Sequence, residues 1–468
     1  MIVKSAVGEK EGQRESRGRR LKTGLALLAC RISGAVLRRL GRGGTSLPGR
    51  IALAVDPEIL SVLAGDVRVT LVTGTNGKTT TCRMIDQAFR DAGLSCFSNR
   101  SGANLLPGIT AEFAAHSSLR GRCRHSHAVI ECDEAAFLQV IRFLSPACLL
   151  VTNLLRDQTE RLGEASDTAR LLREGIARIP DTVLCLNADC PLTASLASEV
   201  SNRVIWYGVN IPADPEGVQD QEDTLCCDRC GFPYLYQYRT YSHLGGYRCP
   251  VCGRGRPAPQ VAVTEIREME EQFSDVIIQV ENKWYPAQIH LPEIHNIYNG
   301  AAAVAAGRAA GISSLASLGA LSRFPCAEGR GNETAVGKAR VRLLLAKNPA
   351  GLNLMLRQIL RNEGSCRLVF LLNDLPADGT DIRWIQEADL EALSARQHRF
   401  SRILLSGLRR KAMKARLLEA GFEKTRLEEI RTCRKLLRAL GAEEGPVFLL
   451  ANYTAMFRLL CRLRRRRR

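Results

Sequence analysis

Residues 74–80 read Gly-Thr-Asn-Gly-Lys-Thr-Thr, which has the residue types and spacing of a phosphate-binding loop. Glycines let the backbone N–H groups point at phosphate oxygens, a lysine adds positive charge, and a threonine hydroxyl can ligate Mg²⁺. The loop is shorter than the pattern G-x-x-x-x-G-K-[ST], because its two glycines are three residues apart instead of five. An apolar stretch precedes it and a helix-like stretch, Thr80–Gly93, follows. The residues expected to hold the phosphates are Gly74, Thr75, Asn76, Gly77, Lys78, Thr79 and Thr80.

An acidic segment, Glu131-Cys132-Asp133-Glu134, follows the apolar stretch 127–130. A carboxylate at the end of a strand beside a phosphate loop can bind Mg²⁺ directly or through water. We therefore expect Glu131 to bind Mg²⁺. The less favoured alternative is that the acidic segment is a solvated loop without a ligand. Asp157, after the next apolar stretch, is a weaker candidate of the same kind.

Four cysteines form two C-x₂-C pairs that are separated by 18 residues, and each pair is followed by glycine. This is zinc-ribbon spacing, in which the glycines allow the tight turns of the two knuckles. Four thiolates leave Zn²⁺ no open position, so the site should be structural. The alternative is a pair of reducible C-x-x-C motifs. The expected ligands are Cys227, Cys230, Cys249 and Cys252.

Two further polar motifs mean little alone. His295–Asn299 opens an alanine-rich helix, where an asparagine is usually a cap. Lys347–Gly351 follows an apolar strand and reads as a turn, although Lys347 could face a nucleotide.

These motifs lie in a chain that alternates short apolar strands with helices, which predicts an α/β fold with a doubly wound parallel sheet. Ligands in such sheets bind at the carboxyl ends of the strands. We expect an N-terminal basic segment and amphipathic helix, an ATP-binding central domain with a zinc-ribbon insertion, and a smaller C-terminal α/β domain with a basic tail. The boundaries are 1–50, 51–325 with the insertion at about 224–256, and 326–468.

Charge and hydropathy narrow the class of protein. The net charge of +18 favours an acidic partner: nucleic acid, an anionic membrane surface or a polyanionic substrate. Most of the seventeen cysteines stand singly in apolar runs, which is typical of reduced thiols in the cytoplasm. No apolar run is long enough to span a membrane. We predict disorder over residues 1–20 and a helix over Leu21–Leu40, which packs on the protein or, less favoured, lies on an anionic membrane.

Taken together, the motifs resemble the Mur ligases and folylpolyglutamate synthases. The resemblance rests on the phosphate loop, T-N-L-L-R-D-Q at 152–158 and H-N-x-x-N-x-x-A-A at 295–303. The cysteine pairs and three more motifs make the chain similar to the MurT-type subunits of lipid II isoglutaminyl synthase. Those motifs are L-G-R-G-G-T-S-L-P-G-R at 40–50, A-K-N-P-A-G-L-N at 346–353 and N-D-x-x-A-D-G-T-D-I-R-W-I at 373–385.

The resemblance implies an ATP- and Mg²⁺-dependent synthetase subunit. It is expected in the cytoplasm, where it could also lie at the inner face of the membrane. It would phosphorylate the α-carboxylate of D-glutamate in the lipid II stem peptide, and ammonia from a GatD-type glutaminase would complete the amidation. By motif, Asn296 and its neighbour Asn299 would face the nucleotide. An aspartate would complete the Cys–His pair of the partner, and this is Asp381 or Asp378, with Asp381 favoured.

The chain departs from the family pattern at three points. Gln158 stands where the wider group of Mur ligases has histidine, and Lys347 replaces a histidine in the A-K-N-P motif. The family's W-I-W-D is here 384–387, Trp-Ile-Gln-Glu, at the expected partner contact. Two other functions stay open: a free-standing ligase that adds an amino acid to a peptidoglycan precursor or folate, and a nucleotide-dependent nucleic-acid-binding module, the least favoured.

Overall fold

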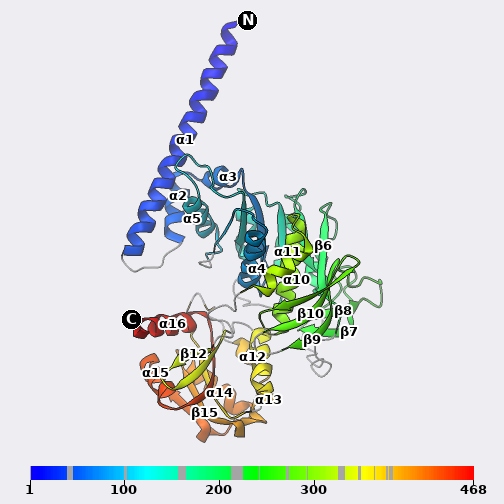
Figure 1. Cartoon of the computed structure of the whole chain (residues 1–468), viewed down its shortest axis with the longest axis vertical. Coiled ribbons are helices and arrows are strands. Elements are labelled where there is room, and N and C mark those ends of the chain that lie inside the picture. Colours follow the sequence, from blue (N-terminus) through cyan, green and yellow to red (C-terminus); the bar gives the residue numbers. More distant parts are fainter. Residues whose placement is uncertain are drawn as a thin grey trace. The chain divides into compact units, whose positions relative to one another are not determined.

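The computed structural model describes residues 2–39, 46–99, 103–155, 165–211, 225–241, 243–269, 273–291, 293–324, 333–345, 349–362, 364–375, 378 and 383–467. Figure 1 shows the elements along the chain. The described residues form two compact units, one from those in 2–155 and 165–324 and the other from those in 333–467.

A nine-stranded sheet is the centre of the first unit, with the order β11-β10-β9-β6-β5-β4-β1-β3-β2. The strands from β2 to β9 in this order pair in parallel, whereas β10 is antiparallel to both β9 and β11. The predicted parallel α/β sheet is therefore confirmed, with an antiparallel edge added. The strands are β1 (Arg68–Thr73), β2 (Cys96–Ser98), β3 (His127–Glu131), β4 (Cys148–Val151), β5 (Val183–Asn187), β6 (Val204–Val209), β9 (Val261–Met269), β10 (Ser274–Val280) and β11 (Lys283–Ile289).

The course of the chain reverses at β1. Strands β2 and β3 lie on one side of β1, and β4, β5 and β6 follow on the other. Because parallel crossovers are right-handed, α4 (Lys78–Asp91) and the later α6 (Phe137–Val140) and α8 (Ala165–Ile176) cover opposite faces of the sheet. Ligands of such folds bind at this reversal. The glycine loop between β1 and α4 is located there.

Two further helices, α10 (Ile294–Ala309) and α11 (Ser314–Ser322), pack against α4. Helix α10 also contacts β4, β5, β6 and β9. Nearly all of its residues from Ile294 to Gly307 are buried, which explains why its sequence is rich in alanine instead of being amphipathic. The short helix α9 (Pro191–Ser195) follows β5.

Four helices form the N-terminal part of this unit: α1 (Ile2–Arg39), α2 (Ser46–Val55), α3 (Ile59–Ala64) and α5 (Leu106–His116). Helix α1 lies along α2 and α5 (Figure 1), so the prediction that it packs on the protein is confirmed. The predicted disorder over residues 1–20 is wrong, because one helix begins at Ile2. That stretch is polar, but its glutamate, lysine, arginine and alanine residues are strong helix formers.

The second unit is a smaller α/β sheet of six strands in the order β12-β13-β17-β14-β15-β16. Only the β12–β13 pair is antiparallel. Its strands are β12 (Glu333–Val336), β13 (Ala339–Leu345), β14 (Cys366–Leu371), β15 (Phe400–Ser406), β16 (Leu427–Ile430) and β17 (Gly445–Ala451). Its helices are α12 (Pro349–Arg361), α13 (Leu390–Ser394), α14 (Arg410–Glu419), α15 (Cys433–Ala442) and α16 (Tyr453–Arg467).

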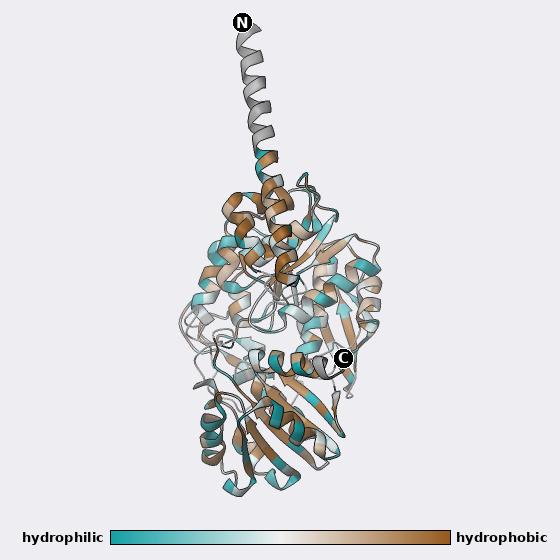
Figure 2. Cartoon of the chain, turned by 90° about the vertical axis from the view of Figure 1, so that its left-hand side faces the viewer, coloured by the Kyte–Doolittle hydropathy of each residue, from teal (hydrophilic) through white to brown (hydrophobic). Residues whose placement is uncertain are grey.

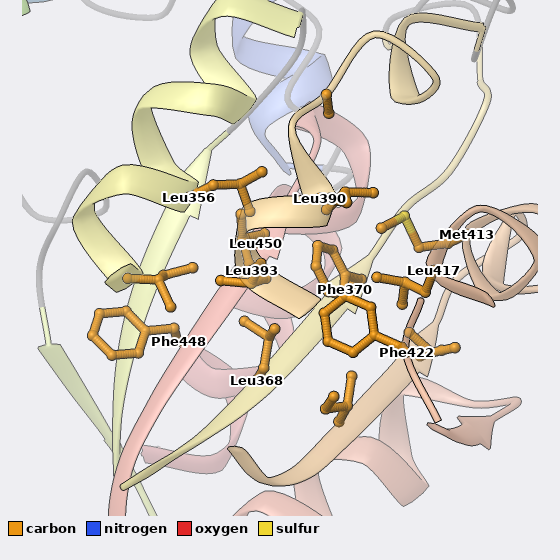
Figure 3. Close-up of a cluster of buried hydrophobic side chains, with 14 of the residues drawn as sticks. Leu356, Leu368, Phe370, Leu390, Leu393, Met413, Leu417, Phe422, Phe448 and Leu450 are labelled. Carbon is orange, nitrogen blue, oxygen red and sulfur yellow. The ribbon is translucent and has the colours of Figure 1, made fainter. Parts of the chain in front are cut away.

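Both faces of this second sheet are buried. Alternate residues of β14 point to opposite sides, so Leu368 and Phe370 join one core, which Figure 3 shows, and Val369 joins the other. The basic tail that starts at Arg462 is helical, because α16 runs to Arg467. Its apolar residues Met456 and Leu459 anchor it in the second core.

Within the described part of the chain, no helix has both the length and the apolar character needed to cross a membrane.

Candidate functional site

At two positions of the glycine loop the backbone has a conformation that only glycine adopts without strain. Gly74 has φ +119° and Gly77 has φ +84°. A Cβ atom at Gly74 would lie 2.3 Å from Thr152 Oγ1, and one at Gly77 would lie 2.2 Å from Asn299 Oδ1. The two glycines therefore allow the loop to approach β4 and α10 as well as to turn.

Hydrogen bonds to the end of β4 fix the loop between the glycines. Thr75 N donates to Asn153 O at 2.8 Å, and Asn76 N donates to Asn153 Oδ1 at 3.0 Å. Asn153 Nδ2 returns a bond to Asn76 O at 3.2 Å. In the sequence Asn153 was only part of the T-N-L-L-R-D-Q motif, whereas in the structure its side chain holds the glycine loop in place.

Lys78 is buried and paired. Its ammonium donates to Glu134 Oε1 at 3.2 Å and Oε2 at 3.1 Å, and also to Gly74 O. Burial disfavours the charged amine, but Glu134 and then Glu131 outweigh burial, so the pKa of Lys78 is raised. Lys78 is thus a fixed positive charge at the first turn of α4. Glu134 lay in the acidic motif, but the sequence did not indicate its pairing with Lys78.

Thr79 and Glu131 lie together as predicted. Thr79 Oγ1 donates to Glu131 Oε2 at 2.8 Å, and Asn104 Nδ2 donates to Glu131 Oε1 at 3.2 Å. Asn99 makes two 2.8 Å bonds with the backbone of Glu131. A hydroxyl and a carboxylate in contact are oxygen ligands of the kind that Mg²⁺ prefers.

Helix α10 joins this group through Asn299. Its Oδ1 accepts from Thr81 Oγ1 at 3.1 Å, and its Nδ2 donates to Asn296 Oδ1 at 3.2 Å. Asn296 and Asn299 are both buried, as is Thr80 in the first turn of α4. The structure therefore connects the H-N-x-x-N motif to the loop directly.

A second buried network is centred on Asp189, directly after β5. Its carboxylate accepts from Arg256 Nε at 2.6 Å, Tyr298 OH at 2.6 Å and Val209 N at 2.8 Å. Burial raises the pKa of Asp189 although Arg256 opposes the shift. These bonds tie α10 to the region of the cysteine pairs, so the network positions α10.

Three predicted residues, Lys347, Asp381 and Asp157, lie outside the described residues. Asp378 is described and buried. Its carboxylate accepts from Thr454 N at 2.7 Å, from Leu375 N at 3.3 Å and from the Thr454 hydroxyl. Asp378 therefore bonds to the first turn of α16, which favours a structural role for it.

The four cysteines of the two C-x₂-C pairs lie together, with all four Sγ atoms within 4.8 Å of one another. Two Sγ–Sγ distances are 3.5 Å (Cys227 to Cys252) and 3.4 Å (Cys230 to Cys249). Tetrahedral zinc with Zn–S bonds of about 2.3 Å requires sulfur atoms about 3.8 Å apart, so this donor set fits zinc.

The two cysteine turns are similar. The glycines after them, Gly231 and Gly253, have φ +73° and +75° and donate N–H bonds to the carbonyls of Cys227 and Cys249. The antiparallel strands β7 (Leu235–Tyr241) and β8 (Leu244–Arg248) lie between the turns. Burial disfavours the Cys227 thiolate, but bonds from the Arg229 backbone N–H and other donors lower the pKa of Cys227 to about 6.

Comparison with known proteins places this site in a family. Residues 72–228 match the family described as Mur ligase middle domain, and residues 345–456 match MurT ligase C-terminal. A Streptococcus pneumoniae protein named lipid II isoglutaminyl synthase (glutamine-hydrolyzing) subunit MurT is 33% identical over 93% of this chain and 96% of its own. The chain belongs to the MurT family.

A Staphylococcus aureus MurT with the same name is 31% identical over 94% of this MurT-family chain and 97% of its own. Solved structures show the same fold at lower identity. A pseudomurein peptide ligase type C from Methanothermus fervidus has a TM-score of 0.63, at 19% identity, over 85% of this chain and 79% of its own. MurF from Acinetobacter baumannii has a TM-score of 0.62, at 18% identity, over 88% of this chain and 80% of its own. The resemblance that the motifs predicted is confirmed, and this MurT-family chain is a ligase.

Proposed function

We propose that this chain is the synthetase subunit of a lipid II isoglutaminyl synthase. It would amidate the α-carboxylate of D-glutamate in the lipid II stem peptide, with ATP as the energy source and ammonia from a GatD-type glutaminase subunit. The observation that carries the proposal is the match along nearly the whole chain to proteins of that name. The connected loop, carboxylate and helix α10 support it.

The proposed chemistry has two steps. First, a carboxylate oxygen of the substrate attacks the γ-phosphorus of ATP, the bond to the bridging oxygen breaks, and ADP leaves an acyl phosphate. Second, the nitrogen of ammonia attacks the acyl carbon, inorganic phosphate leaves, and a proton is lost from nitrogen. Lys78 and the N-terminus of α4 would stabilise the charge on the transferred phosphoryl group.

The residues that would hold the nucleotide are the loop Gly74–Thr80, Asn296 and, by motif, Lys347. Related folds are known with nucleotides, such as MurF from Thermotoga maritima with ADP, which has 14% identity and a TM-score of 0.57. Thr79 and Glu131 would hold Mg²⁺, because their oxygens are in contact with one another. When bound, Mg²⁺ would neutralise phosphate charge during transfer.

We also propose that the partner subunit depends on an aspartate of this chain to complete its Cys–His pair. The hydrogen bonds of Asp378 to Thr454 engage its carboxylate within this chain. We therefore assign this role to Asp381.

The use of ammonia distinguishes the proposed amidating subunit from a free-standing ligase. The purified chain should convert the lipid II glutamate to isoglutamine, with a mass loss of about 1 Da, when ATP, Mg²⁺ and ammonium are supplied, because each exchange of OH for NH₂ removes that mass. Glutamine alone should support no product until the glutaminase subunit is added. Product from glutamine with this chain alone, or addition of a whole amino acid, would instead identify a free-standing ligase.

We propose that the four clustered cysteines are the ligands of a structural zinc ion. The purified chain should contain about one zinc per molecule, and Cys249→Ser should lose the metal and lower Tm by roughly 5 °C or more. Cys226→Ser is the matched control, since Cys226 is exposed beside Cys227 but lies outside the cluster. Metal content by elemental analysis and thermal unfolding measure the effect. A metal-free wild-type chain with unchanged Tm in strong chelator would contradict the assignment.

A further inference from the structure

Helix α1 carries an exposed apolar stripe on the face that does not contact the protein. The stripe, which we call the α1 stripe, comprises Leu21, Leu25, Leu28, Ile32 and Val36, with exposed fractions of 47% to 70%. Their spacing of three or four residues puts all five on one side of the helix, over about 22 Å of its length. Single exposed leucines are ordinary, whereas a continuous row of five indicates a binding surface.

The opposite side of α1 is fixed to the rest of the first unit. Ala26, Leu27 and Cys30 are buried, and the helix contacts α2 and α5. Arg31 Nη2 donates to Ala114 O at 3.3 Å, at the end of α5. In Figure 2 the coloured part of α1 shows brown, hydrophobic residues beside those of its neighbours. The stripe is therefore the outer face of a helix that is already packed.

The segment that carries the α1 stripe is basic. Residues 16–55 contain nine lysines and arginines and no aspartate or glutamate. Among them Arg19, Lys22 and Arg39 are exposed. A second copy of this chain is therefore not the favoured partner for this face, because two such basic helices would repel one another.

A neighbouring loop extends this surface. The loop after α5 passes beside α1, because Leu119 O lies 3.4 Å from where a Cβ on Gly24 would be. Leu119 is itself 51% exposed, and Arg120, Arg122 and Arg124 around it are exposed too. An aliphatic centre with arginines at its border thus continues from the helix onto the loop.

We infer that the α1 stripe and the loop at Leu119 form a docking surface for an anionic phospholipid membrane. An amphipathic helix of this kind lies in the plane of the interface with its apolar side chains among the acyl chains, and each nearby lysine or arginine adds about 1 kcal/mol of attraction to anionic lipid. The inference goes beyond the proposed function, because it rests on the exposed side chains and their charge alone.

Flotation of the full chain with lipid vesicles tests this surface. The chain should bind phosphatidylglycerol vesicles at least about tenfold more tightly than phosphatidylcholine vesicles, and added salt should weaken binding. The variant Leu25→Ser/Ile32→Ser should lose about tenfold in partitioning, because both side chains would no longer be buried in lipid. Arg19→Glu/Lys22→Glu should weaken binding and reduce its dependence on salt.

The matched control is Leu315→Ser/Leu408→Ser, which removes two exposed leucines outside the α1 stripe (71% and 54% exposed) and should bind like the wild type. Equal thermal unfolding of all variants would show that the folded chain is compared throughout. No binding to phosphatidylglycerol, or wild-type binding by the stripe variant, would overturn the inference. A dimer in light scattering that the stripe variant abolishes, without vesicle binding, would assign the surface to a second copy. The flotation experiment contains no nucleotide or substrate, so a negative result would leave the proposed function unaffected.

Discussion

Gly77→Ala should reduce nucleotide binding and ligase activity by about a hundredfold, whereas Gly93→Ala should keep both near the wild-type level. The two glycines flank α4 and have nearly the same backbone, with φ +84° and +77°. Alanine at either position meets a left-handed strain of about 1–2 kcal/mol. Only at Gly77 would the new Cβ also collide with another residue, at 2.2 Å from Asn299 Oδ1, while nothing lies within 4 Å at Gly93.

The collision at Gly77 cannot be relieved cheaply. Asn299 is held by Thr81 at 3.1 Å and Asn296 at 3.2 Å, so its movement breaks two buried hydrogen bonds at about 1–3 kcal/mol for each unsatisfied group. The loop would move instead, and its N–H groups would lose their aim at the phosphates. Calorimetric titration with ATP and Mg²⁺, together with thermal unfolding, measures both effects. Wild-type affinity in Gly77→Ala would show that the contact between the loop and α10 is not needed.

Lys78→Met should lower kcat/KM by about 10²–10³-fold, the usual loss when a group that stabilises developing charge is removed. The same change leaves the Glu134 carboxylate buried without its partner, which is strongly destabilising. The double variant Lys78→Met/Glu134→Gln separates these effects, because it removes the unpaired charge. We expect the double variant to recover stability but not activity. Lys283→Met, at an exposed position, is the matched control.

The raised pKa of Lys78 sets the pH range of this experiment. A raised folded-state pKa means that the stabilisation from the Lys78 pair is fully present below the usual lysine pKa. It is lost only as the pH rises through the raised value. Activity and unfolding should therefore be compared at neutral pH. Recovery of activity in the double variant would contradict the role given to Lys78.

The sequence predicted the parts of the site that depend on local spacing. Strand β3 begins at His127, where the apolar stretch 127–130 begins, and the glycine loop follows β1 as expected. Glu131 was expected at a strand end beside the loop, and its contact with Thr79 agrees with this, because the ends of neighbouring parallel strands meet at one edge of a sheet. The four cysteines come together for a similar reason, since their spacing is that of two knuckles.

The missed residues depend on contacts between distant segments. Asn153 reaches the loop across 77 residues, Glu134 reaches Lys78 across 56, and Asp189 reaches Arg256 across 67. Glu134 and Asn153 lay in motifs that the sequence pointed to, but nothing in the local sequence indicates which distant residue each one bonds to. The prediction for the N-terminal segment was wrong for a different reason. The polar composition of residues 1–20 suggested disorder, but it also suits a helix, and α1 begins at Ile2.

We propose that this chain uses ATP to activate a carboxylate as an acyl phosphate. The most direct test uses a lipid II analogue whose D-glutamate α-carboxylate carries the heavy oxygen isotope, with ATP, Mg²⁺ and ammonium. One carboxylate oxygen leaves with phosphate in the proposed second step, so the released inorganic phosphate should contain one heavy oxygen, detected by mass spectrometry or phosphorus NMR. The amide product should keep the other. Unlabelled phosphate formed together with amidated product would contradict the acyl phosphate, and with it the role proposed for this site.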